Sequence, residues 1–228
     1  MSIRRNRLRL GALGVVLASA AVVVALGSGS ALAASGGGKS SGWHIGYYNP
    51  GNSLSFAQAA AAPGGVAMLN FTNQANTALL VTDQKAQFPT LLGDLTGKSV
   101  SASYTIAGAT GAFTYYGTCG STPASVRYFF ETSNAGGFDE THYWWSNPVA
   151  APLANGSVSL PPVPLTGANW SDFYGHFGDD PQYAAGFNAA VSNVTEIGVS
   201  FGGGCFFENG VGTTNGSGSF TLNSYAAN

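Results

Sequence analysis

The residues best suited to binding chemistry form an aromatic and charged stretch near the middle of the chain. Residues 127–131 read Arg-Tyr-Phe-Phe-Glu, and Tyr-Trp-Trp follows at 143–145. On a strand over 125–132, alternation brings one set of side chains together on one face: Arg127, Phe129 and Glu131. A ring that stacks on the apolar side of a sugar, beside charged planar groups that hydrogen-bond its hydroxyls, can hold a carbohydrate. The stretch therefore predicts a carbohydrate-binding face.

The same residues also allow a purely structural interpretation, which the sequence leaves open. Arg127 and Glu131 can pair on a solvated face while a loop partly covers the ring between them. Trp144 and Trp145 are adjacent, so on a strand they point to opposite faces, and we expect one of them in the core. Trp170 lies in a loop-like segment, either as a lid over the core or as part of a binding surface. The candidate ligand-binding residues are Arg127, Phe129, Glu131, Tyr143, Trp144, Trp145 and Trp170.

No catalytic arrangement is evident from the residue types and their spacing. Glycoside hydrolysis needs two carboxyl groups about 5–10 Å apart on rigid elements. The acidic pairs at 139–140 and 179–180 are adjacent in sequence, and the second suits the start of a helix. A His-Glu-x-x-His metal motif is absent. We therefore expect no enzyme, and a glycan-active site of Glu131 with Asp172 or Glu208 is the least favoured interpretation.

Several segments alternate between apolar and polar residues with a period of two, which is typical of half-buried strands. The clearest are 99–106, 196–201 and 219–225, where the apolar residues are predicted to face the core. Further strands are expected near 66–71, 77–82, 112–117, 125–132, 141–146 and 156–160.

One connecting helix is predicted before the last strands. The Asp-Pro dipeptide at 180–181 can supply the N-cap and the first helical residue. Tyr183, Phe187 and Val191 then fall on one face of that helix. The run 56–62 is predicted to form another turn or two of helix. These elements predict an all-β fold, an antiparallel two-sheet β-sandwich (jelly roll) with one short connecting helix.

The N-terminus has the three parts of a secretory signal. Four arginines lie within the first nine residues, an apolar stretch covers 10–26, and Ala-Leu-Ala ends the segment at 31–33. The apolar stretch is short for a membrane anchor, which is the alternative interpretation. We predict a cleaved signal peptide over 1–33, a flexible Gly/Ser leader over 34–42 and a single domain over 43–228. The compact, arginine-rich signal suggests a secreted bacterial protein.

The charge of the exported part and its lack of a long apolar segment exclude two classes of function. Without residues 1–33 the chain keeps four basic residues against ten acidic ones, a net charge of −6. Nucleic-acid binding needs clustered Lys and Arg, so no nucleic-acid partner is expected. No later segment is long and apolar enough to be an integral membrane span.

The two cysteines, Cys119 and Cys205, are predicted to form a disulfide. An exported protein with an even cysteine count usually pairs its cysteines. They lie far apart in the sequence and no histidine is near either of them, unlike the ligands of a metal cluster. No metal site is therefore expected from the cysteines.

Three segments resemble the galactose-binding-like jelly-roll domains that occur as carbohydrate-binding modules in secreted bacterial proteins. They are Asp-Leu-Thr-Gly-Lys-Ser-Val-Ser at 94–101, Ile-Gly-Val-Ser-Phe-Gly-Gly at 197–203 and Gly-Ser-Phe-Thr-Leu-Asn-Ser-Tyr at 218–225. The resemblance covers about residues 43–226 and extends to uncharacterised exported proteins of this plan. These motifs are structural, so the resemblance implies a fold and no family ligand residue is carried over.

Jelly-roll binding modules often hold a structural Ca²⁺ between carboxylates and backbone carbonyls near a sheet edge. The candidate ligands for such an ion are Asp83, Asp139, Asp172 and Glu208, and no other cofactor is expected. The leading hypothesis is a non-catalytic module whose partner is a polysaccharide or cell-surface glycan. The alternative is an extracellular structural or protein-interaction domain with no small ligand.

Overall fold

The computed structural model describes residues 40–49, 53–115, 124–133, 139–203 and 210–228, all within the unit Gly37–Asn228. The predicted signal peptide, the predicted Cys119–Cys205 disulfide and Glu208 lie outside the described residues. The first strand begins at Ser40, so the last three residues of the predicted leader belong to the domain.

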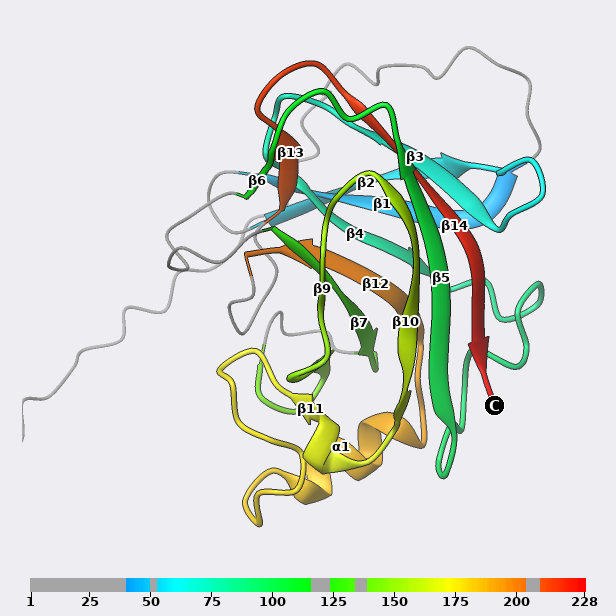
Figure 1. Ribbon diagram of the computed structural model, residues 1–228. Coiled ribbons are helices and arrows are strands. Elements are labelled where there is room, and N and C mark those ends of the chain that lie inside the picture. Colours follow the sequence, from blue (N-terminus) through cyan, green and yellow to red (C-terminus); the bar gives the residue numbers. More distant parts are fainter. Residues whose placement is uncertain (1–39, 50–52, 116–123, 134–138, 204–209) are drawn as a thin grey trace, which may run out of the picture. The chain divides into compact units, whose positions relative to one another are not determined.

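The described residues form strands and one short α-helix (Figure 1), which confirms the all-β class. The first seven strands are β1 (Ser40–Asn49), β2 (Ser53–Ala60), β3 (Ala67–Phe71), β4 (Thr77–Thr82), β5 (Ser99–Ala107), β6 (Phe113–Tyr115) and β7 (Ser125–Glu131). The next seven are β8 (Tyr143–Ser146), β9 (Ala151–Pro152), β10 (Gly156–Pro164), β11 (Trp170–Ser171), β12 (Glu196–Gly202), β13 (Val211–Thr213) and β14 (Gly218–Ala227). A 3₁₀ turn, η1 (Gly167–Asn169), and the helix α1 (Ala184–Val191) lie between them.

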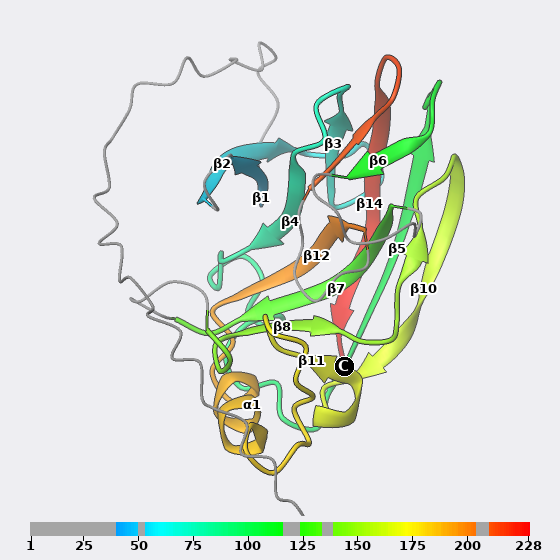
Figure 2. The same ribbon diagram turned by 90° about the vertical axis from the view of Figure 1, so that its left-hand side faces the viewer.

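Every described strand pairing is antiparallel, and the main path of the sheet runs in the order β10-β5-β14-β3-β2-β1-β4-β12-β7-β8-β11. Beside this path, β13 pairs with β4 and β6, and β9 pairs with β7. The sheet curls, and Figure 2 shows it running from β10 and β5 on the right, past β3 and β4, to β7 and β8 below. Strands β2 and β3 are paired through a single residue pair, Ala60 with Met68. The strand pairing thus gives one curled sheet in place of two separate sheets. In the middle of this sheet, β2 and β3 share only the one residue pair.

The core lies inside this curl, where aromatic rings from its two halves meet. Phe201 of β12 lies 5.2 Å from Phe71 of β3 and 5.1 Å from Phe220 of β14, measured between ring centroids. Tyr128 of β7 approaches Tyr225 of β14 at 6.1 Å. Edge-on ring pairs of this kind add to the free energy gained by burying the rings. They join strands that share no backbone hydrogen bonds.

The predicted alternation is confirmed in β5 and in the first part of β14. In β5 the buried residues Val100, Ala102, Tyr104 and Ile106 alternate with half-exposed ones. The apolar residues of β12 and β14 that were expected to face inward belong to the core. Strand β12 is not half-buried as predicted, because its residues from Ile197 to Gly202 are buried on both faces.

Two predictions about helical segments are wrong in detail. The helix α1 begins at Ala184, because residues 180–182 form a turn in which the Asp180 carbonyl accepts hydrogen bonds from the backbone N–H of Tyr183 and Ala184. The Asp180 side chain accepts instead from the N–H of Phe177, in the preceding loop. The run 56–62 is mostly strand β2, since residues 56–60 pair with β1 between Gly46 and Ser40.

Glycine at position 198 is required by the close approach of β12 to β4. A Cβ atom there would lie 2.1 Å from the Leu80 carbonyl oxygen and 2.8 Å from the Val81 Cα. We expect Gly198→Ala to lower the free energy of unfolding by about 3 kcal/mol, since backbone must move. Urea unfolding measures this loss.

Gly108→Ala is the matched control for that substitution. Gly108 has a φ of +70° with nothing within 4 Å of an added Cβ, so only backbone strain of about 1 kcal/mol is expected. An equal loss in the two variants would mean that contact with β4 does not explain the glycine.

Candidate functional site

The face of β7 opposite the core carries the predicted binding residues, and most of this face is buried. Phe129 is 1% exposed and Trp145 on the neighbouring strand β8 is 2% exposed, with their ring centroids 5.1 Å apart. Both belong to a second apolar cluster with Leu79 and Val81 of β4. Arg127 is also buried. The side chains share a face, as predicted, but offer no exposed ring for stacking on a ligand.

Trp144 and Trp170 lie on the opposite side of the sheet, within the core. The Trp144 ring packs 5.0 Å from Phe187 of α1, and Trp170 lies 4.8 Å from Phe130. Their indole N–H groups donate to the backbone carbonyls of Thr141 and Pro164. Trp144 and Trp145 therefore point to opposite faces, as predicted, yet both are buried because apolar clusters cover both faces here. Trp170 belongs to β11 and is a core residue.

Two carboxyl groups face each other at the end of this outer face. Glu131 of β7 is directly opposite Glu196 of β12, and Tyr143 of β8 is opposite Glu131 on the other side. Directly opposed residues on antiparallel strands have Cβ atoms about 5 Å apart, so like charges there repel.

Burial raises the pKa of Glu131 to about 7. Burial, followed by the negative charges of Glu131 and Asp83, raises the pKa of Glu196 to about 8. The pair therefore holds protons near neutral pH. Burial and the same carboxyl groups also raise the pKa of Tyr143 to about 12.

A second arrangement lies in the loop between β11 and α1, residues 172–183. The Asp172 carboxylate is fully buried. It accepts hydrogen bonds from the backbone N–H of Tyr174 at 2.8 Å and of His176 at 2.9 Å, and from His176 Nδ1 at 2.9 Å. Gly175 turns the chain between them with a φ of +89°, which favours glycine. The buried carboxylate thus fixes the loop in one conformation.

This loop presents aromatic rings to solvent, and we call Tyr174, His176 and Tyr183 the aromatic platform. Tyr174 is 54% exposed, one of two large apolar residues of the described chain that are exposed. The His176 and Tyr183 rings stack with centroids 4.1 Å apart and planes inclined by 10°. Tyr174 lies 6.1 Å from His176. Exposed rings on a rigid loop are suited to stacking on a ligand.

Carboxylates surround the aromatic platform. Burial first, then the negative charges of Asp172, Glu140 and Asp180, raise the pKa of Tyr183. Glu140 lies near Tyr183 because the turn that carries Glu140 packs closely on α1. The approach of this turn to Gly186 of α1 is so close that a Cβ atom there would lie 2.8 Å from the Thr141 side chain. The same turn is held by Asp139, which accepts hydrogen bonds from the backbone N–H of Thr141 and His142 and from His142 Nδ1.

The sequence interpretation did not identify the aromatic platform, because it considered Trp170 as the binding ring of this segment and assigned Tyr183 to a helix face. The signal was present in the spacing of the loop residues. An Asp followed by an aromatic residue two positions on, and then Gly-His, suits a turn in which the carboxylate accepts from the backbone ahead of it. Such a turn exposes the side chains at its tip.

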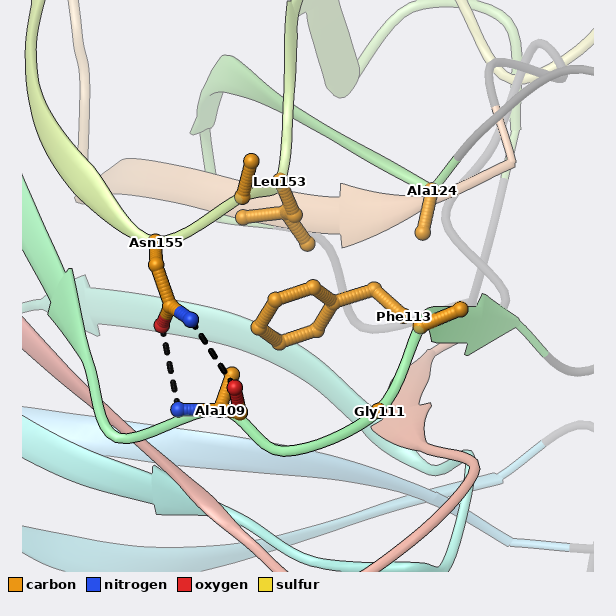
Figure 3. Close-up of a pocket in the computed structure, with 8 residues that line it drawn as sticks. Ala109, Gly111, Phe113, Ala124, Leu153 and Asn155 are labelled. Carbon is orange, nitrogen blue, oxygen red and sulfur yellow. Dashed lines mark hydrogen bonds between the residues drawn. The ribbon is translucent and has the colours of Figure 1, made fainter.

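A cavity of about 300 Å³ lies elsewhere, beside β6 and the loop between β9 and β10 (Figure 3). Its walls are mostly small and apolar: Ala109, Gly111, Ala112, Phe113, Ala124, Leu153, Ala154 and Asn155. Asn155 supplies a polar side chain to this wall. Its side-chain amide donates to the Ala109 carbonyl at 2.8 Å and accepts from the Ala109 N–H at 3.0 Å. This cavity therefore presents few free polar groups with which to orient a ligand.

The three described candidates for Ca²⁺ ligands are spread over separate turns. Asp172 and Asp139 are bonded to backbone N–H groups and to His176 and His142, while Asp83 lies 3.6 Å from His44. Within the described ranges, no group of three or more His, Cys, Asp or Glu side chains is arranged to hold a metal ion.

Comparison with protein-family models, curated proteins and solved structures finds no match to this chain. The resemblance to galactose-binding-like modules therefore rests on the sequence pattern alone. In the part of the chain that the structure describes, no helix has the length and apolar character needed to cross a membrane.

The Glu131–Glu196 pair makes stability depend on pH. Both folded-state pKa values lie above the ordinary glutamate value, so the folded protein keeps protons that the unfolded chain loses from about pH 4.5 upward. The stability that this pair contributes is therefore fully present at about pH 4.5 and below, and it is lost as pH rises to about 8. We expect a loss on the order of 2 kcal/mol between pH 5 and pH 8.5, measured by urea unfolding.

Glu196→Gln should reduce this loss by at least half, because the carboxyl group with the more strongly raised pKa no longer titrates. The control is Glu140→Gln, an exposed carboxyl whose removal should leave the pH dependence unchanged. An unaltered pH dependence in Glu196→Gln would contradict the assignment to this pair.

Proposed function

We propose that this protein is an exported, non-catalytic module that binds carbohydrate through the aromatic platform of Tyr174, His176 and Tyr183. The observation that carries the proposal is the exposed Tyr174 ring on a loop fixed by the buried Asp172 carboxylate. The sequence placed the binding surface on β7 and β8, but Phe129, Trp144 and Trp145 are buried there and Tyr143 is half-buried. The proposed surface is therefore at the end of the fold near β11 and α1 (Figure 1).

Preorganisation is the physical reason for choosing this loop. A sugar ring gains little from stacking if the loop must first become ordered, because ordering opposes binding. Here three hydrogen bonds to Asp172 and the His176–Tyr183 stack fix the side chains in advance. Nearby carboxylates, including the exposed Glu140, can accept hydrogen bonds from hydroxyl groups.

The fold supports the proposal at the level of architecture. We propose that the curled sheet is a jelly-roll-type sandwich whose two halves, β10-β5-β14-β3 and β2-β1-β4-β12-β7-β8-β11, remain joined at Ala60 and Met68. Rings of the two halves pack edge-on against one another across the core, as side chains of two facing sheets interdigitate in a sandwich. Binding modules of this architecture commonly place ligands on loops at the ends of the strands.

The second candidate function is a structural or protein-interaction domain with no small ligand. It is favoured by the burial of Phe129, Trp144, Trp145 and Trp170, each of which has a packing explanation. The same Tyr174 substitution separates the two candidates, because this second function requires no glycan affinity.

Tyr174→Ala is expected to weaken glycan binding by about 5- to 150-fold, since loss of one stacked ring costs on the order of 1–3 kcal/mol. A polymer that retains the protein is first identified by pull-down on insoluble polysaccharides, with reducing-sugar release assayed in parallel. The affinity for a soluble oligosaccharide of that polymer is then measured by calorimetry.

Phe56→Ala is the matched control, because Phe56 is equally exposed (52%) but lies on β2. It should leave the affinity unchanged. Equal binding by wild type and Tyr174→Ala would remove the platform as the site. Retention on no polymer would favour the structural function, and sugar release would show an enzyme.

Charge predicts which glycans bind. The platform is surrounded by carboxylates, and the described basic residues are the buried Arg127 and two lysines, Lys85 and Lys98, on the segment between β4 and β5. A ring and carboxylates together attract ammonium groups. We expect chitosan, which carries free amines, to bind more tightly than chitin, its acetylated counterpart, and a polyuronate not to bind.

The preference for chitosan should weaken as salt is raised, because exposed charges are screened. Glu140→Gln should reduce the ratio of chitosan to chitin affinity while leaving chitin binding in place. A polyuronate bound as tightly as chitosan would contradict the role of these carboxylates.

A further inference from the structure

Strand β2 has a long edge that is almost unpaired. One side of β2 pairs with β1 from Ser53 to Ala60. On its other side, pairing within the described residues is limited to Ala60 with Met68 of β3. Figure 2 shows β2 beside β1 at the upper left, apart from β5 and β10. Apart from that pair, no described strand pairs with the N–H and C=O groups along this edge, and such groups form a template for another strand.

The side chains of β2 do nothing to prevent such pairing. The strand reads Ser-Leu-Ser-Phe-Ala-Gln-Ala-Ala, with neither a charged residue nor a proline. Residues 55–58 are all exposed, and Phe56 is 52% exposed. Sheet edges that stay free in solution usually carry charges, prolines or bulges that repel a further strand.

The end strand β10 has the protection that β2 lacks. It contains Pro161, Pro162 and Pro164, which have no N–H to donate, and its register shifts between Leu160 and Val163. The other end strand, β11, is only two residues long. Neither of these two end strands is therefore as well suited as β2 to pairing over several residues.

We propose that β2 pairs antiparallel with β2 of a second copy of this chain, forming a two-fold symmetric dimer. Pairing of β2 with β10 of another copy would propagate into an open filament, but the prolines of β10 disfavour it. Identical edges meeting about a two-fold axis instead form a closed contact. This inference is independent of the proposed function, since β2 is not part of the aromatic platform.

The apolar surface beside the edge fits a second copy. Phe56 lies over β1 opposite Gly46, where a Cβ atom would come within 3.2 Å of the Phe56 ring. Leu54 lies on the same face of β2 and packs on the second apolar cluster. Pairing of two β2 strands brings these side chains of the two molecules together and removes Phe56 from water. Because β2 is uncharged, no like charges oppose each other across the axis.

Sedimentation equilibrium of the purified protein over a range of concentrations tests the proposal. We expect a reversible monomer–dimer equilibrium. Phe56→Lys places a charge at the axis and should raise the dissociation constant at least about tenfold. Hydrogen exchange at the β2 amides should slow with increasing protein concentration in wild type but not in this variant.

Ser159→Lys on β10 is the matched control, because it adds the same charge to an exposed position of the other edge. It should leave the dimer intact. Thermal unfolding checks that Phe56→Lys remains folded, and Phe56→Ser, which adds no charge, provides a second measurement with a smaller effect. A protein that stays monomeric at all concentrations, assembles beyond a dimer, or dissociates equally in both lysine variants would overturn the proposal.

Discussion

The packing of aromatic rings across the curled sheet is the interaction on which the rest of the structure depends. Phe71 and Phe220 come from one half of the strand order and Phe201 from the other. Their rings form T-shaped, edge-to-face contacts. Backbone pairing between β2 and β3, which joins the halves directly, is limited to one residue pair. Side-chain packing therefore holds the two halves of the sheet together, a role that hydrogen-bonded strands have in a closed barrel.

That curl also decides the character of the outer face. Strands β4, β7 and β8 pack their inner residues on the core, but their outer residues form a second apolar cluster. Charged groups on this face are half-buried or buried, which explains why the opposed Glu131 and Glu196 hold protons that exposed glutamates lose. A site that resembles a sugar-binding surface in sequence becomes, after folding, a packed layer with a pH-sensitive pair at its end.

The loop that presents aromatic side chains to solvent lies where the sheet ends. Asp172 directly follows β11, and its buried carboxylate organises the loop that carries Tyr174 and His176. The free edge of β2 is a separate exposed feature, defined by main-chain groups and by Phe56. One surface is suited to a small ligand and the other to a second copy of the chain, because the first offers fixed rings and carboxylates and the second an uncharged strand.

The sequence by itself determined the all-β class, the alternating strands such as β5, and the opposite orientations of Trp144 and Trp145, because these follow from a local period of two. It did not determine that both tryptophans are buried, since burial depends on which segments cover each face. The opposition of Glu131 and Glu196 could not be predicted either, because it depends on the register of two strands 65 positions apart in the chain. Likewise, the exposure of Tyr174 and of the β2 edge depends on how the sheet curls, and distant contacts across the core control that curl.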